Sequence, residues 1–159
     1  MDINIRFATS EDATSIYQFI CELAVYEREP LAVQVTPQDL AEQLAGNNPP
    51  FECLVAETLE GSAVGFALFF QSYSTWRGRS GIYLEDLYVP EAIRGRGVGS
   101  RLFQRLGQIT VERGCARLEW AVLDWNQPAI NFYRAMGATP LGEWTTWRLT
   151  DEALLELGA

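Results

Sequence analysis

The sequence contains no histidine and no lysine, and only three of its 159 residues are cysteine. Without histidine there is no Ser-His-Asp triad, no Cys-His pair and no histidine ligand for a metal. The cysteines, Cys21, Cys53 and Cys115, lie far apart in the chain, which argues against a disulfide framework and against a zinc site. We therefore expect no metal, and proton transfer by carboxylate, tyrosine, cysteine, arginine-oriented water or backbone.

Long apolar runs are also absent, and no segment approaches the ~20 residues that a membrane-spanning helix requires. Residues 1–6 show neither the basic nor the apolar part of a secretory signal. The length and a hydrophobic content of 48% are sufficient for one sizeable core. We expect a single cytoplasmic domain over residues 1–159, without contact to a membrane.

The net charge of −9 is unevenly distributed along the chain. Residues 1–60 contain eleven acidic residues and two arginines, whereas the remainder contains ten of each. An acidic half disfavours nucleic-acid binding and attracts a cationic small molecule, although it would also serve solubility alone. The arginines cluster around one glycine-rich turn, which predicts an anion site in an otherwise acidic protein; they are Arg94, Arg96, Arg101 and Arg105.

This turn, residues 94–99, lies between a strand-like run at 81–89 and a helical run that begins at Val98. Its glycines allow several N–H groups to point into one concavity, where the helix dipole adds positive potential, so we predict a pyrophosphate site. A Rossmann site fits poorly, because its G-x-G-x-x-G follows the first strand directly, whereas here several strands and the insert Pro90–Ile93 come first. A Walker loop is excluded because it needs a lysine.

The rest of the chain predicts alternating elements without a linker or an internal repeat. A strand, a glycine turn, a helix and another strand in succession indicate a parallel, right-handed crossover within a mixed sheet. The expected helices lie at about 10–26, 36–46, 98–113 and 128–136, and the expected strands at about 3–7, 51–57, 63–73, 82–89, 116–123 and 143–149.

The glycine turn resembles the R/Q-x-x-G-x-G/A acetyl-CoA loop of the GNAT superfamily of N-acetyltransferases. Residues 51–57, 73–79, 83–89 and 121–133 resemble its diamine (spermidine/spermine) and thialysine acetyltransferase branch, and the similarity covers nearly the whole chain. The resemblance implies an α/β (α+β) fold, a single GNAT domain with a mixed, mostly antiparallel sheet that is splayed at its centre and flanked by helices. It also implies a homodimer, for which residues 144–147 are a candidate contact.

The resemblance implies acetyl-CoA as the co-substrate and assigns most of its contacts to the main chain. Leu87 and Val89 would bond the pantetheine arm, and Asn126 would contact the cofactor. The side chains of the two loop arginines are expected to add positive charge at the phosphates. The pyrophosphate is expected on N–H groups of Arg94, Gly95, Arg96, Gly97, Val98 and Gly99.

An acceptor amine with a pKa near ~10.4 arrives protonated and must lose a proton before it attacks a thioester. Our candidate proton acceptor is Glu85, acting through a water, while Asp86 either shares this task or binds the ammonium group. Neighbouring strand residues point to opposite faces, so only one of the two reaches a site unless a bulge intervenes.

The thiolate of coenzyme A needs a proton to leave, and a phenol with a pKa near ~10 suits this step. The resemblance places the general acid at Tyr133, which would also contact the cofactor. An ordinary apolar helix face is the alternative for this residue. Direct transfer in a ternary complex is expected, because a cysteine acyl-enzyme would lack a histidine to activate it.

Glu27 and Trp76 are candidate substrate contacts, since a carboxylate attracts the far end of a cation and an indole can line an alkyl chain. Surface charge or core packing is the alternative for each. Ser74 and Thr75 stand before Trp76 where diamine enzymes commonly carry an acid, which favours the thialysine type.

We predict an acetyl-CoA-dependent N-acetyltransferase that acts on the primary amine of a small cationic substrate, either a thialysine- or lysine-like amine or a diamine or polyamine. Two other classes stay open, namely a protein or peptide N-acetyltransferase and a non-catalytic, coenzyme A-binding regulatory module.

Overall fold

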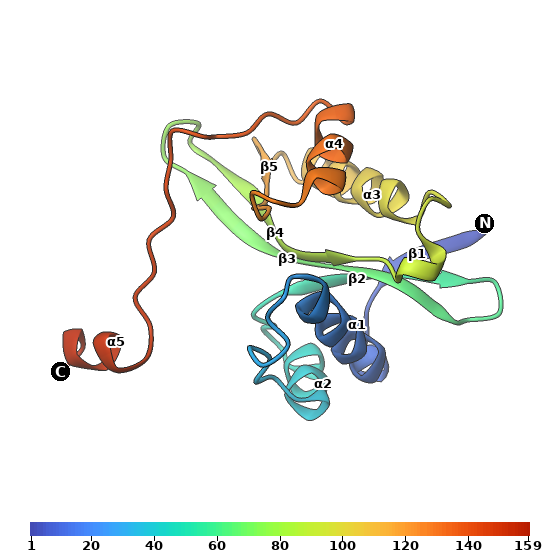
Figure 1. Cartoon of the computed structure of the whole chain (residues 1–159), viewed down its shortest axis with the longest axis horizontal. Coiled ribbons are helices and arrows are strands. Elements are labelled where there is room, and N and C mark those ends of the chain that lie inside the picture. The colour runs from blue at the N-terminus through green and yellow to red at the C-terminus, as the bar shows by residue number, and fades with distance from the viewer. The chain divides into compact units, whose positions relative to one another are not determined.

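The computed structural model describes residues 1–159 and divides them into two compact units, Met1–Ala121 and Val122–Ala159. The first unit contains the sheet and three helices (Figure 1). Its strands are β1 (Ile3–Phe7), β2 (Glu52–Thr58), β3 (Ala63–Ser74), β4 (Arg79–Tyr88) and β5 (Leu118–Glu119). Its helices are α1 (Ala13–Tyr26), α2 (Pro37–Ala45) and α3 (Val98–Glu112), with short 3-10 turns at Ser10–Asp12 and Glu91–Ile93.

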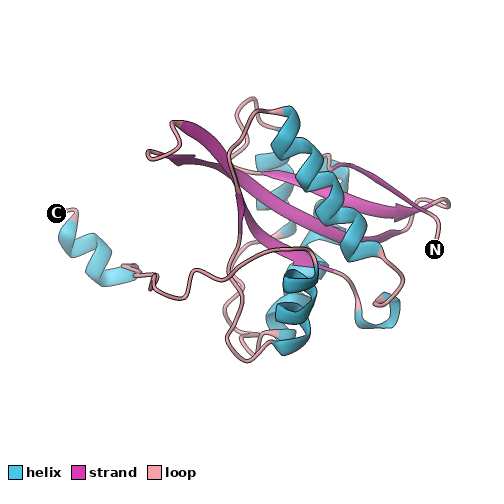
Figure 2. Ribbon diagram, turned by 90° about the horizontal axis from the view of Figure 1, so that it is seen from above, coloured by secondary structure: helices cyan, strands magenta, loops and turns pink.

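The five strands follow their order in the chain, β1-β2-β3-β4-β5. The first four pair antiparallel, and β5 pairs parallel to β4 after the crossover through α3, as the sequence predicts. Figure 2 shows this twisted sheet by its colour. The parallel pairing is short, because β5 meets β4 only at Ile82 and Tyr83. The residues of β4 after Tyr83 therefore have no pairing with β5 on the edge opposite β3, as expected for a splayed sheet.

Side chains satisfy backbone N–H groups at the 3-10 turn before α1 and at the start of α2, but not at the start of α3. Before α1, Thr9 N donates to Asp12 Oδ2 at 2.8 Å, and Thr36 and Asp39 form a reciprocal capping box at the start of α2. Helix α3 begins at Gly97 instead, with a left-handed backbone and no side-chain cap. This helix start therefore leaves its donors open to a ligand.

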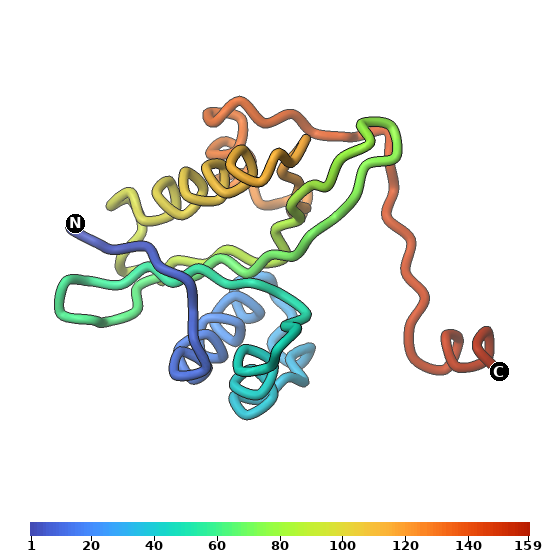
Figure 3. The backbone as a smooth tube through the Cα atoms, turned by 180° about the vertical axis from the view of Figure 1, so that it is seen from behind, coloured from blue at the N-terminus to red at the C-terminus, as the bar shows by residue number.

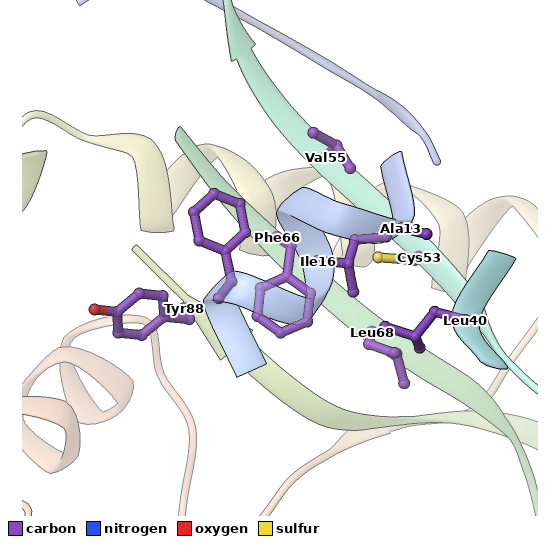
Figure 4. Packing of buried hydrophobic residues seen from close by; sticks show 9 residues of the cluster. Ala13, Ile16, Leu40, Cys53, Val55, Phe66, Leu68 and Tyr88 are labelled. Carbon is purple, nitrogen blue, oxygen red and sulfur yellow. The ribbon is translucent and has the colours of Figure 1, made fainter. Parts of the chain in front are cut away.

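The core of the first unit lies on both faces of the sheet, with α1 and α2 on one face and α3 on the other (Figure 1). Ile16 and Phe19 of α1 pack with Phe66, Leu68 and Tyr88 of the sheet, as Figure 4 shows for most of this cluster. The rings of Phe19 and Phe66 stack with centroids 5.8 Å apart. On the other face, α3 buries its apolar stripe, which consists of Val98, Leu102, Phe103, Leu106 and Ile109.

The second unit contains α4 (Gln127–Ala135), an extended run and α5 (Asp151–Leu157). Figure 3 traces the run that leads from α4 to the C-terminal helix. Two tryptophans in the run are exposed, Trp144 by 68% and Trp147 by 91%. This unit therefore buries little apolar surface of its own.

Two predicted strands need correction. The strand expected at 116–123 pairs only at Leu118–Glu119, and the strand expected at 143–149 does not form. Its aromatic and β-branched residues favour extended backbone, but a strand also needs a neighbouring edge to bond, and none of the five strands pairs with it. Helix α5 was not predicted, although Thr150 followed by two acids is a typical helix start.

No helix in the chain combines the length and the apolar character needed to cross a bilayer.

Candidate functional site

The glycine turn has the backbone that the sequence predicts. Gly95 and Gly97 lie in the left-handed region, with φ of 79° and 84°, and a Cβ on either would meet no atom within 4 Å. These glycines are needed for their backbone angles rather than for space. The first hydrogen bond into α3 runs from Arg101 N to the Gly97 carbonyl at 3.1 Å, so the N–H groups before it lie at a positive helix end. The arrangement fits a bound pyrophosphate.

Gly65 on β3 packs closely against the residues that flank this turn, a role that sequence reasoning missed. A Cβ on Gly65 would lie 3.1 Å from the Tyr88 carbonyl and 3.3 Å from side-chain atoms of both Val89 and Val98. The missing side chain therefore allows β3 to approach the end of β4 and the first residue of α3. In the sequence, the signal for this contact is a lone glycine within a strand.

The side chain of Arg94 binds protein groups at the entrance to the turn. Its Nε donates to the Val89 carbonyl at 2.9 Å, and its guanidinium lies 4.7 Å from the ring centroid of Tyr26 and 5.4 Å from that of Tyr88. Arg96, two residues later, is exposed. Of the predicted arm contacts, Leu87 pairs with Ala67 of β3, and Val89 already accepts the bond from Arg94.

A β-bulge in β4 separates Glu85 from Asp86. Leu84 pairs with Phe69 and Asp86 pairs with Leu68, so Glu85 is the extra residue. Cross-strand partners share a face, and Leu68 belongs to the core cluster under α1. The bulge therefore turns Asp86 to the α1 face, whereas a regular strand would place it on the α3 face with Phe69.

Asp86, on this face, lies within electrostatic range of two other predicted carboxylates, Glu85 and Glu27. Burial raises the pKa of Asp86 to about 6, and the negative charges of Glu85 and Glu27 add to this shift. Burial also raises the pKa of Glu27, which caps the C-terminal end of α1. Glu85 is exposed and Asp86 is partly buried. Such a cluster attracts a cation, because an ammonium group would relieve the repulsion between the acids.

Trp76 does not lie with these acids. It stands in the turn between β3 and β4, is 89% exposed, and follows Ser74, whose hydroxyl accepts from Arg77 N. Along the hairpin, the pair Ser74–Arg79 lies six β3 residues beyond the Leu68–Asp86 pair, which corresponds to roughly 20 Å. A separate cavity of about 400 Å³ is lined by Arg77, Arg79, Cys115 and Ala116, and its arginines disfavour a cationic ligand.

The two remaining candidates belong to the second unit. Asn126 is 8% exposed and is the N-cap of α4, where its Oδ1 accepts from Ala129 N at 3.4 Å. Tyr133 lies on α4, partly exposed, with its ring centroid 5.8 Å from that of Phe132. Its carbonyl accepts from Met136 N and Ala138 N at the end of the helix. The capping oxygen of Asn126 is occupied locally, while an amide also carries donors.

The cysteines show no feature of a nucleophile. Cys53 is 2% exposed, and burial raises the pKa of its thiol. Cys21 and Cys115 are unpaired and partly buried. No group of three or more histidine, cysteine, aspartate or glutamate side chains is arranged to hold a metal ion.

Sequence reasoning also missed the contacts that connect α1 with the end of β4. Burial raises the pKa of the Tyr88 phenol, and the nearby carboxylate of Glu22 on α1 raises it further. Tyr26, four residues after Glu22, lies under Arg94. The i, i+4 spacing places Glu22 and Tyr26 on one face of the helix, which was the available signal.

Comparison with known proteins gives consistent matches. The family model described as "Acetyltransferase (GNAT) family" matches residues 13–138. The thialysine N-epsilon-acetyltransferase of Bos taurus is 39% identical, with 98% of this chain and 96% of that protein covered. The human spermidine/spermine N(1)-acetyltransferase-like protein 1 is 36% identical over 96% of this chain, but this covers only 23% of that protein. An integron cassette protein of V. cholerae shares the fold, with a TM-score of 0.83, 24% identity, and coverage of 99% and 98%.

Proposed function

Because the chain belongs to the GNAT acetyltransferase family, whose members use acetyl-CoA as co-substrate, we propose that it acetylates the primary amine of a small cationic substrate. The observation that carries the proposal is the cluster of Glu27, Glu85 and Asp86. Two of its members, Glu85 and Asp86, lie on the strand that leads into the glycine turn, and Glu27 lies at the C-terminal end of α1. One end of β4 thus provides a site for a cation beside a site for a pyrophosphate.

We propose Asp86 rather than the expected Glu85 as the proton acceptor, and the bulge and the raised pKa of Asp86 support this choice. Asp86, with its pKa near 6, is a better proton acceptor at neutral pH than an ordinary carboxylate. We therefore assign the deprotonation of the amine to Asp86, directly or through a water. Glu85, the original candidate, stands at the bulge and shares the attraction for the ammonium group or relays the proton.

Acetyl-CoA supplies the activated acyl group when it is bound. The N–H groups of residues 94–99 would hold its pyrophosphate, with charge added by Arg96, and Leu87, Val89 and Asn126 remain candidates for the rest of the molecule. The buried, protonated thiol of Cys53 supports direct transfer without an acyl-enzyme.

Tyr133 is proposed as the general acid that protonates the departing thiolate. Tyr133→Phe is expected to lower kcat by roughly 10²-fold or more, while affinity for coenzyme A changes little. Steady-state kinetics and calorimetry measure the two quantities. An unchanged kcat would remove Tyr133 from the mechanism.

The named relatives favour the substrate class. The Bos taurus protein carries thialysine in its name and matches over nearly its full length, whereas the relative named for spermidine and spermine matches over a small part of its own length. We propose a thialysine- or lysine-like amine, with a diamine as the second candidate. A binding role for Trp76 would require it to act away from the carboxylates of its own chain.

We also propose that the two units form one domain over residues 1–159, that the enzyme is a cytoplasmic homodimer, and that residues 144–147 take part in the dimer contact. The exposure of Trp144 and Trp147 supports this contact, because aromatic residues are enriched in interfaces. Sedimentation velocity of the wild type and of Trp147→Ala tests it. A monomeric wild type would contradict the proposal.

The proposed activity is tested by following thiol release from acetyl-CoA with thialysine, lysine, spermidine, short peptides or no acceptor. We expect release to depend on a small amine, with thialysine or lysine the fastest. Release with peptides alone would support a protein or peptide acetyltransferase. Thermal stabilisation by coenzyme A without release for any acceptor would support a non-catalytic binding module.

A further inference from the structure

The arginine at the entrance to the glycine turn connects the two halves of the site. Arg94 precedes Gly95 directly, and its own N–H donates to the Glu91 carbonyl at 3.2 Å. Its side chain leaves the loop and contacts both the end of β4 and the end of α1. A loop residue that served only as a charge for phosphate would not need these partners.

The contact on β4 is with rigid structure. Tyr88 is 8% exposed and packs in the core, where its ring centroid lies 6.2 Å from that of Phe19. The Val89 carbonyl is the next acceptor along the chain, and Val89 is also buried at 8%. These contacts constrain the orientation of the planar guanidinium, although Arg94 itself is exposed and can be held further by a ligand in the turn.

The contact on α1 is with the helix end that carries an acid of the cation site. Tyr26 is the last residue of α1 and Glu27 is its C-cap. Hydrogen bonds hold the turn that follows, from Arg28 N to the Val25 carbonyl at 3.1 Å and from Glu29 N to the Ala24 carbonyl at 2.8 Å. Arg28 adopts a left-handed φ of 66°, which is unusual for a residue with a side chain. Glu27 follows Tyr26 directly at this helix end, so a displacement of Tyr26 would displace Glu27 as well.

We propose that Arg94 is a positioning residue that couples the two substrates: a pyrophosphate bound by residues 95–99 fixes Arg94, and Arg94 fixes Tyr26 and the adjacent Glu27 for the amine. The inference rests on the proposed function. Coenzyme A then raises the affinity for the amine, and the amine raises the affinity for coenzyme A by the same factor, because coupling between binding sites is reciprocal. No proton or acyl group passes through Arg94.

The test measures thialysine binding by calorimetry, first to the protein alone and then to the protein saturated with coenzyme A, which has no acetyl group to transfer. In the wild type we expect coenzyme A to tighten thialysine binding at least fivefold, within the usual range of coupling. Arg94→Ala should reduce this factor to less than twofold. In steady state, its KM for the amine should rise more than its KM for acetyl-CoA.

Three further variants distinguish the positioning role of Arg94 from the effect of its positive charge. Arg94→Lys keeps the charge but loses the planar stack and the Nε bond, so it should lose the coupling while binding coenzyme A within about threefold of the wild type. Tyr26→Leu, which keeps apolar bulk, should do the same. Arg96→Ala is the matched control: it removes the same charge from the same loop, and should weaken coenzyme A binding with the coupling unchanged.

Melting by circular dichroism confirms that each variant is folded, and Tyr26→Leu and Arg94→Lys decide the question where Arg94→Ala fails to fold. A wild type that binds coenzyme A without any gain in thialysine affinity overturns this inference alone. So does wild-type coupling in Arg94→Lys together with Tyr26→Leu. A wild type that does not bind coenzyme A overturns the proposed function, and this inference with it.

Discussion

The glycine turn follows the end of β4 that carries Glu85 and Asp86, yet the turn and the carboxylate cluster are built in opposite ways. The turn offers main-chain N–H groups at a helix start, its residues 94–97 are exposed, and the two left-handed positions are glycines. The cluster gathers like charges against the core, and the pKa of Asp86 rises as a result. A site for an anion can thus be made from backbone at little cost, whereas a site for a cation needs side chains whose burial destabilises the fold.

The comparison also assigns different tasks to the arginines near the turn. Arg94 contacts Tyr26, Tyr88 and the Val89 carbonyl, so its charge is used within the protein. Arg96, which like Arg94 is exposed, lies two residues further along the turn. Attraction for phosphate therefore does not have to come from the arginine that begins the motif.

The largest effect is expected from Asp86→Asn, which removes the carboxyl from the cluster. We expect kcat/KM for the amine to fall by roughly 10²-fold or more, since the proton acceptor is lost. Glu85→Gln, one residue away on the exposed side of the bulge, is the control and should cost less. Steady-state kinetics with the best acceptor measures both, and a larger loss in Glu85→Gln would return the role to Glu85.

Asp86→Asn should also show that the ionised Asp86 carboxylate lowers the stability of the wild type at neutral pH. The pKa of Asp86 is about 6 in the folded state against 3.8 when unperturbed, so ionisation favours the unfolded chain and stability is lost as the pH rises from about 4 to just above 6. Two pKa units correspond to at most about 3 kcal/mol. Denaturant unfolding should show the stability of Asp86→Asn relative to wild type rising across this window, and a constant difference would contradict the shift.

The pKa of Asp12 is shifted in the opposite direction from that of Asp86, so its effect on stability has the opposite dependence on pH. A bidentate hydrogen bond from Arg6, at 2.8 Å to each oxygen, holds the pKa of Asp12 below its usual value. Its contribution to stability is therefore present above about pH 4 and is lost as the pH falls through the lowered pKa. Loss of wild-type stability in acid should therefore appear at a lower pH than the change assigned to Asp86, which lies between about pH 4 and 6.

In the turn, Gly97→Ala should act through the backbone alone. A Cβ there has open space, but φ is 84°, so we expect a loss of about 1 kcal/mol of stability and roughly tenfold weaker binding of coenzyme A. Gly107→Ala is the matched control in the interior of α3, where no positive φ occurs and nothing lies within 4 Å. It should gain about 0.5–1 kcal/mol without a change in affinity. Equal effects at the two glycines would contradict this account.

The smallest effect is expected at the ion pair between Arg113 and Glu52, which lies apart from both regions of the comparison. Arg113 donates to the two carboxylate oxygens at 2.6 and 2.7 Å, and both side chains are about 40% exposed. A double-mutant cycle with alanine should give a coupling of at most about 1 kcal/mol. Turnover should not change, and a change would mean that surface charge, rather than the cluster, controls activity.

Much of the turn could be predicted because its signal is local. Positive φ at Gly95 and Gly97 follows from glycine between a strand and a helix, and the parallel crossover follows from the order of the elements. The failed strand at 143–149 shows the limit of such reasoning. Its residues favour extended backbone, but pairing requires a second strand that sequence alone does not provide.

The cluster could be predicted only in part. The acids were identified from the sequence, but the choice between Glu85 and Asp86 depends on a bulge opposite Leu68 and Phe69. No residue in this stretch of the sequence indicates a bulge. The contact between the Arg94 guanidinium and the Tyr26 ring joins residues almost 70 positions apart, which only the packing of α1 on the sheet brings together.

The sequence by itself determined the chemistry that this protein has available: it has no histidine or lysine, a glycine turn suited to an anion, and acids in excess over bases. The tertiary structure decided which of these groups act together. A strand register, one extra residue in β4 and the approach of α1 to the end of β4 bring distant side chains within reach of each other. The physical reason is that backbone angles follow from the residue at each position, whereas the burial, the pKa and the partners of a side chain depend on distant parts of the chain.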